Sequence, residues 1–468
     1  MEQGLQKLLR SCVVIVSAVV LSACSNLSAG NLFSHYTVQN QKVQRSVKAG
    51  DYEKAASQLP ESMAGDILDN FEKGRVYLLN EQYEESSAAF SVSDQAVRQW
   101  QDQATISISE TATDIGSLAV NDNLKNYQPS DYELGFLHLY MGLGYLIDND
   151  LEGALIEMRR ANQVQERAKQ TREKELQAAE SELKKQGISP NLGSVLSRYP
   201  DAGEKLQAVQ NGYLLFLSGL LYETEGDLNS AYVDYRRALT VLPDNLQVIE
   251  SSMRVARRLG MNQDLELLTK RYGELRLLAD DEARVIVIDE QSVVEAMQGW
   301  QLSLPVYDSR GNGAIYSLAL PYYQDQGLEK FSSLQLNNQA LTSSQLVDVN
   351  LMAQNDLSER MTSIVIRQAL RVYAKDQIRK SAAKGDDVGN LLFNVWNTLT
   401  EQPDTRSWQT LPGQVRSASM HVPAGEQSLK VGGEEYKFNV DANRTVLVWV
   451  SRQGQNSTIW HKQLGNLR

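Results

Sequence analysis

A pattern of small and aromatic residues recurs in the first 280 residues and most constrains the fold. In its clearest copy, Asn211–Asn245, Gly219 and Tyr222 are spaced as on one helix, and Gly226-Asp227 marks a turn. A second helical pattern follows and ends at a proline, with Ala231, Tyr235, Ala238 and Pro243 at its key positions. The pattern predicts a hairpin of two helices that approach closely at the small residues.

Further copies lie upstream. Gly142 begins one, and its second helix, Ile156–Ala161 (IEMRRA), matches Val233–Ala238 (VDYRRA) of the first copy. A weaker copy contains Gly74, Tyr77, Tyr83, Glu84 and Phe90, and Gly50–Ala55 is a fragment of one more. Together these predict a stack of helical hairpins over residues 37–280.

The hairpins resemble the tetratricopeptide (TPR) repeat, a unit of about 34 residues in which an aromatic side chain fills the gap between hairpins. Stacked repeats form a solenoid with a concave face suited to peptide or helical partners. The resemblance implies that side chains of the first helices line a partner groove. The candidate groove residues are Arg75, Leu79, His138, Leu215 and Ser218.

The N-terminus is typical of a secretory signal: Lys7 and Arg10 precede an uncharged apolar stretch, Ser11–Leu21. Leu21–Cys24 resembles the lipobox of bacterial lipoproteins, which implies cleavage after residue 23 and lipidation (palmitate) of Cys24. Ser25, rather than Asp, implies sorting to the periplasmic face of the outer membrane. A plain signal peptide with an incidental cysteine, or a buried strand, are the alternatives. We therefore expect a signal peptide over residues 1–23 and a polar tether over residues 24–36.

The net charge argues against two classes of partner, and the cysteine count argues against a disulfide. The formal charge of −12 argues against nucleic acid or an anionic membrane face as the main partner. The only cysteines are Cys12, inside the predicted signal, and Cys24, so no disulfide is expected in the mature chain.

Two segments interrupt the repeats. Residues 163–190 are rich in charge, with Glu and Lys/Arg at three- and four-residue spacings, and predict a helical insertion that either contacts a partner or is a solvated arm. Gln101–Tyr132 is polar and predicts a loop. Leu246–Leu278 predicts a last hairpin broken at Gly260–Asn262.

The periodicity changes from about residue 282, and residues 281–468 predict an α+β domain that ends in a small β subdomain. Strands are expected at Arg284–Ile288, Ala314–Leu320, Ser344–Met352 and Val446–Val450, helices at Leu357–Lys384 and Val388–Leu399, and hairpin turns at Gly311–Gly313 and Gly432-Gly433. With the helical repeats, the expected fold class is mainly α.

Three segments of this domain carry a second resemblance: Glu401–Trp408 with Leu411-Pro412, Val422–Gly425, and Leu357–Ile378. Together with the lipobox and the repeats, they resemble an uncharacterised family of bacterial TPR-like outer-membrane lipoproteins. The family's association with lipoprotein activators of peptidoglycan synthases implies a role in the cell envelope. It implies no catalytic residues.

The sequence offers little chemistry. His35, His138, His421 and His461 lack metal-ligand spacing, and no nucleophile or phosphate-loop motif is present, so we expect no metal, cofactor or enzymatic activity. The adjacent acids of Asp280–Glu282 could supply a carboxylate pair for glycoside hydrolysis. Adjacent acids after a helix are, however, more typical of a solvated linker.

One local segment suggests a ligand site. Asp404, Arg406 and Trp408 could build a cleft in the C-terminal domain. In the alternative interpretation, Asp404 and Arg406 order a loop, and Trp408 plugs the junction between helices and β domain.

The sequence thus predicts a lipid-anchored TPR-type scaffold for envelope proteins, with an envelope enzyme or a glycan- or lipid-binding protein as the alternative. A purely structural spacer is a third possibility.

Overall fold

The computed structural model describes residues 34–107, 127–186, 188–190, 206–308, 313–324, 327–382 and 402–465. The predicted signal peptide, Cys24, the turn at 311–312 and the predicted helix at 388–399 lie outside the described residues.

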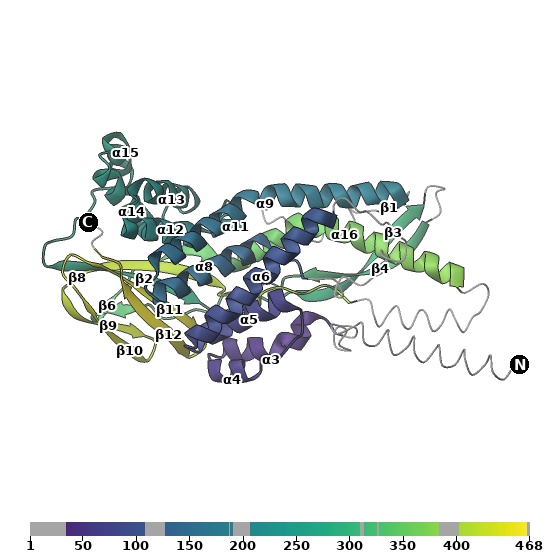
Figure 1. Ribbon diagram of the computed structural model, residues 1–468, viewed down its shortest axis with the longest axis horizontal. Helices are drawn as coiled ribbons and strands as arrows, with labels where there is room; N and C mark the ends of the chain where they lie inside the picture. The colour runs from purple at the N-terminus through teal and green to yellow at the C-terminus, as the bar shows by residue number, and fades with distance from the viewer. Residues whose placement is uncertain are drawn as a thin grey trace, which may run out of the picture.

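The N-terminal half consists of helices that pair as hairpins, as the repeats predict (Figure 1). The helices are α3 (Tyr36–Lys48), α4 (Tyr52–Ser57), α5 (Asp66–Leu79), α6 (Tyr83–Ser107), α8 (Asp131–Ile147), α9 (Leu151–Gln186), α11 (Leu206–Val209), α12 (Gly212–Glu225), α13 (Leu228–Val241), α14 (Leu246–Arg258) and α15 (Asn262–Tyr272). The pairs α5–α6, α8–α9, α12–α13 and α14–α15 are in contact. The helical repeat region is therefore confirmed.

Each repeat glycine lies under a large side chain of the second helix. A Cβ at Gly74 would stand 2.5 Å from Phe90 Cε1, and one at Gly219 would stand 2.7 Å from Tyr235 Cδ1. At Gly142 the covering side chain is Met158, at 2.5 Å. The missing Cβ is what lets these helices approach.

The strands of the described residues, all of them from the C-terminal half except β1, form three sheets. The strands are β1 (Ile188–Pro190), β2 (Glu282–Gln291), β3 (Gln298–Asp308), β4 (Gly313–Tyr322), β5 (Gln335–Leu336), β6 (Gln339–Ala340), β7 (Ser344–Asp348), β8 (Gln414–Pro423), β9 (Gly425–Val431), β10 (Glu434–Val440), β11 (Thr445–Gln453) and β12 (Asn456–Gln463). The five-stranded sheet has the order β12-β11-β2-β8-β7, in which only the β11–β2 pair is parallel. The other sheets are β10-β9-β5-β6 and β1-β3-β4. Because the sheets make up much of this half, "mainly α" holds for the repeats alone.

The five-stranded sheet is the middle layer of the molecule. On one face, Ile286 and Ile288 join the core formed by the helical hairpins. On the other face, Val285 and Val287 pack with Leu429 and other residues of the four-stranded sheet. Strand side chains alternate between faces, so the apolar run in β2 serves two cores.

Two long helices, α9 and α16 (Val349–Ala382), run side by side away from this sheet towards β1-β3-β4 (Figure 1). Part of the α9 extension is packed rather than solvated, because Ala179 belongs to a core with Met361 and Val365 of α16. The predicted loop at 101–132 is also partly wrong, since α6 continues to Ser107 and α8 begins at Asp131.

The close helix approach makes a testable prediction. Replacing Gly74 with Ala places a methyl group against Phe90, which cannot yield easily because its ring lies 5.9 Å from Tyr140 and 5.8 Å from Trp408. We expect Gly74→Ala to lower the free energy of unfolding by about 1–3 kcal/mol, although alanine favours helices.

Urea denaturation measures this change. Gly433→Ala is the matched control, because a Cβ there meets nothing within 4 Å, and its effect should stay within about 0.5 kcal/mol. Wild-type stability in Gly74→Ala would contradict the packing argument.

Candidate functional site

The five predicted groove residues are buried. Arg75, Leu215 and Ser218 are 0% exposed, and Leu79 and His138 are 1% and 5% exposed. They therefore do not line an open groove, and that prediction is corrected. For Arg75 and Leu79 the physical reason is that strands of the C-terminal half cover them, through Glu290 and Ser451 at Arg75 and through Thr458 at the Leu79 carbonyl.

Two of the five side chains turn towards second helices instead. Ser218 donates a 2.6 Å hydrogen bond to Asp234, and His138 Nδ1 lies 2.8 Å from Glu157. Both contacts join the two helices of one hairpin.

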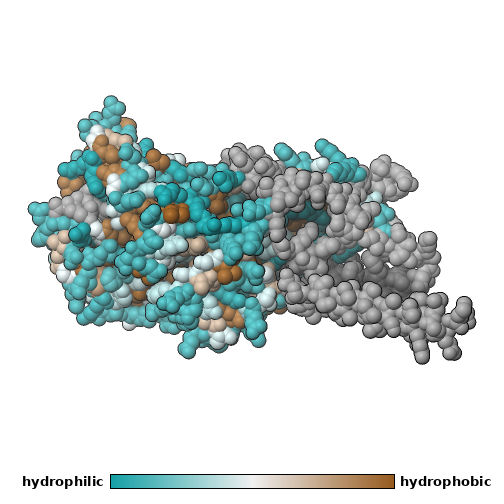
Figure 2. All heavy atoms as spheres, viewed as in Figure 1, coloured by the Kyte–Doolittle hydropathy of each residue, from teal (hydrophilic) through white to brown (hydrophobic). Residues whose placement is uncertain are grey.

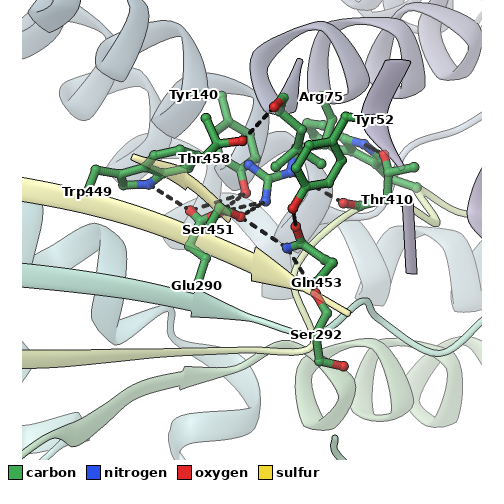
Figure 3. Close-up of polar contacts among 12 residues, drawn as sticks. Tyr52, Arg75, Tyr140, Glu290, Ser292, Thr410, Trp449, Ser451, Gln453 and Thr458 are labelled. Atoms are coloured by element: carbon green, nitrogen blue, oxygen red, sulfur yellow. Dashed lines mark hydrogen bonds and ion pairs between the residues drawn. The ribbon is translucent and has the colours of Figure 1, made fainter. Parts of the chain in front are cut away.

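Arg75 makes the central contact between the halves (Figure 3). Its guanidinium donates to Glu290 of β2 at 2.7 Å and to Ser451 of β11 at 2.8 Å, and both members of the ion pair are fully buried. The Tyr140 ring lies 4.7 Å from the guanidinium carbon. Burial raises the pKa of Glu290, although the charge of Arg75 opposes that shift. The pair ties the repeats to the five-stranded sheet.

Residues 404–411 lie against the first helices, where a TPR scaffold would hold a partner. The Trp408 ring is fully buried, stacked 4.5 Å from Phe71, with Phe90 and Tyr140 at 5.8 Å each. Its indole nitrogen donates to Thr410 at 3.1 Å. Trp408 thus stands at the junction of helices and β domain, as in the alternative interpretation above, and not in a cleft.

Two buried carboxylates bind the backbone of this segment. Glu72 accepts hydrogen bonds from the Gln409 amide at 2.7 Å and the Thr410 hydroxyl at 2.6 Å, and Glu133 accepts one from the Trp408 amide at 2.7 Å. Burial raises the pKa of each carboxyl to about 7, although the hydrogen bonds oppose the shift. Capturing an extended segment through its backbone amides is how a groove binds a peptide.

Asp404 and Arg406, by contrast, line a cavity of about 140 Å³. Arg406 donates to the Asp404 carboxylate from Nε at 2.9 Å and from Nη2 at 2.7 Å, which orders the loop. Arg360 and Arg367 of α16 line the same cavity. The structure therefore brings two of the three predicted cleft residues together at a small polar cavity.

A larger polar cavity was missed from the sequence. It measures about 740 Å³ and is lined by Asp289, Arg416, Arg452 and Asn350, among others. Asp289 and Arg452 form a buried bidentate pair, at 2.9 and 2.6 Å. The sequence signal that could have indicated this cavity is the presence of charged residues at the ends of apolar strand runs.

Metal and membrane features are not found in the described part of the chain. No group of His, Cys, Asp and Glu there could hold a metal ion, and no helix described is long and apolar enough to cross a membrane.

Comparison with known proteins yields only distant likenesses. No family model and no curated protein matches the chain. A structure of MamA AMB-1 is 11% identical, covers 50% of this chain and 88% of its own, and has a TM-score of 0.28. One of MamA MSR-1 is 13% identical, with 51% and 95% covered and a TM-score of 0.27. The TPR2AB domain of yeast Sti1 in complex with pHSP90 is 9% identical, with 50% and 87% covered and a TM-score of 0.18. Scores this low carry no conclusion about function.

The buried carboxylates predict a pH dependence. Between an unfolded pKa of 4.5 and a folded pKa of about 7, the folded chain holds protons that the unfolded chain has released. The free energy of unfolding contributed by Glu72 and Glu133 therefore falls as pH rises from 5 to 8, by about 2 kcal/mol for each carboxyl.

Urea unfolding at pH 5 and pH 8 tests this dependence against Glu72→Gln/Glu133→Gln. The wild type should lose more stability between the two pH values than the double variant. Equal losses would mean that these carboxyls do not titrate in this range.

Proposed function

We propose that this chain is an outer-membrane lipoprotein facing the periplasm, where its repeats act as a protein-binding scaffold in envelope assembly. The lipobox-like Leu21–Cys24 and the following Ser25 support the anchor and its membrane. The hairpin stack supports the scaffold, because repeat surfaces present side chains at regular intervals.

One observation supports the scaffold proposal and changes which surface we propose as the binding surface. Residues 404–411 occupy the side of α5 and α8 that a partner would be expected to use, so we place the partner surface on the second helices. There, Ile156 and Val233 occupy equivalent positions of successive repeats and are 44% and 57% exposed. Each lies two residues before the side chain that covers its repeat glycine.

Apolar side chains repeated at this interval suit a partner segment with its own apolar periodicity. The face of the molecule drawn in Figure 2 is mostly hydrophilic, with apolar patches. Solvent-exposed apolar positions among charges are the anatomy of a reversible interface. The proposed link to peptidoglycan synthesis rests on the family resemblance alone.

A second candidate is a glycan-binding envelope protein, favoured by the cavity of about 740 Å³. Its mixed lining of Asp289, Asn350 and Arg416 offers both donors and acceptors. This candidate uses the C-terminal half and leaves the second helices without a partner.

The proposed lipidation of Cys24 leads to the first prediction. Cys24→Ala should abolish incorporation of labelled palmitate and release the protein from the membrane fraction. Ser25→Asp should keep the label but move the protein to the inner-membrane fraction of a density gradient. Unchanged membrane attachment of unlabelled Cys24→Ala would contradict the anchor.

Partner contact makes the second prediction. A photo-crosslinking amino acid at position 156 or 233 should capture envelope proteins in cells, with peptidoglycan synthases or their activators enriched by mass spectrometry. The same amino acid at position 246 is the matched control, because Leu246 is 45% exposed on α14, the first helix of its hairpin.

Capture at all three positions, or at none, would contradict a specific scaffold surface. Purified protein that carries glycan in place of a protein partner would favour the second candidate.

A further inference from the structure

A cavity of about 360 Å³ lies away from the sites above, between α14, the segment after α15, and strands β2 and β8. Three of its arginines, Arg254, Arg257 and Arg258, come from α14, at spacings that place them on one helix face. Arg276 follows α15, and Arg284 belongs to β2. The volume is within the range of small-ligand sites.

The cavity is positive on a protein whose net charge is −12. Glu223 pairs with Arg254 and Arg258, and Glu282 pairs with Arg276. The lining also includes one carboxylate, Glu250. Five guanidinium groups against these three carboxylates leave a formal excess of two positive charges.

Arg284 is the decisive residue. It is only 6% exposed, and its Nε and Nη2 atoms have no hydrogen-bond partner in the described part of the chain. On the neighbouring strand, His421 lies directly opposite. Its Nδ1 makes no hydrogen bond in the described part of the chain and lies 3.8 Å from Glu282 Oε2. A buried guanidinium without a bound anion is costly, so this position favours a countercharge from outside the described part of the chain.

The remaining titratable groups keep the cavity receptive to an anion. Burial and the charge of Arg276 lower the pKa of His421, while Glu282 opposes that shift. Burial raises the pKa of Glu250, which accepts a hydrogen bond from Ser419 at 3.3 Å. Neither group cancels the excess of guanidinium charge at neutral pH.

The other wall is apolar, formed by Leu275, Leu277 and Leu278, and Leu277 is 49% exposed. We propose that this cavity binds the phosphate group of an amphiphile, with the phosphate at Arg257 and Arg284 and the apolar chain along the leucines. Arginine forks match phosphate oxygens, and two excess charges match a phosphate monoester better than a single carboxylate. The site is independent of the proposed scaffold function.

Calorimetric titration of the purified protein with three probes tests the site: dihexanoyl phosphatidic acid, inorganic phosphate and dihexanoyl phosphatidylcholine. We expect phosphatidic acid to bind more tightly than inorganic phosphate, and phosphatidylcholine not to bind. Equal binding of phosphatidic acid and inorganic phosphate would overturn the apolar half of the proposal, and binding of neither would overturn all of it.

The variant Arg284→Gln should weaken phosphatidic acid binding by roughly tenfold to one-hundredfold. Lys270→Gln is the matched control, because it removes the same charge from exposed α15 and should leave binding unchanged. Removing an unpaired buried charge should not lower the melting temperature of the free protein. A lower melting temperature with unchanged binding would assign Arg284 a structural role and contradict the proposal.

Discussion

The fold depends on one buried ion pair between segments far apart in the chain. Arg75 on α5 and Glu290 on β2 are both fully buried, so each would be costly without the other. Ser451 and Trp449 also donate hydrogen bonds to the Glu290 carboxylate, and Arg75 donates a further one to the Thr410 carbonyl. Because Arg75 and Glu290 lie on different parts of the chain, the pair forms only when the helical repeats pack against the five-stranded sheet. The hydrophobic core that the repeats share with this sheet agrees with this.

A neighbouring contact covers the face of α5 and α8 on which the sequence predicted a partner groove. Residues 404–411 hold that face through backbone amides and one aromatic side chain, as a peptide ligand would. The chain therefore carries its own occupant for the groove. On the second helices, Ile156 and Val233 remain exposed.

Local pattern was enough to predict the hairpins, because small residues at helical spacing and the turn between two helices are signals within one repeat. The β-branched run in β2 likewise predicted a strand. What covers the first helices was not predictable in this way, since Glu72 and Gln409 are 337 residues apart. Apolar periodicity shows which face is buried but not by what. The signal that was overlooked is charge on a buried face: Glu72, Arg75 and Glu133 all need partners from another part of the chain.

Native-state hydrogen exchange of Arg75→Met is the most direct test of this dependence. The variant leaves Glu290 buried without its countercharge, so amides of α8 and of β11 should lose protection together, by about 3–5 kcal/mol. The double variant Arg75→Met/Glu290→Met should recover most of that loss in both elements. Loss confined to α5 and its neighbouring helices, with wild-type protection in β11, would show that the repeats and the sheet fold independently and would contradict the account.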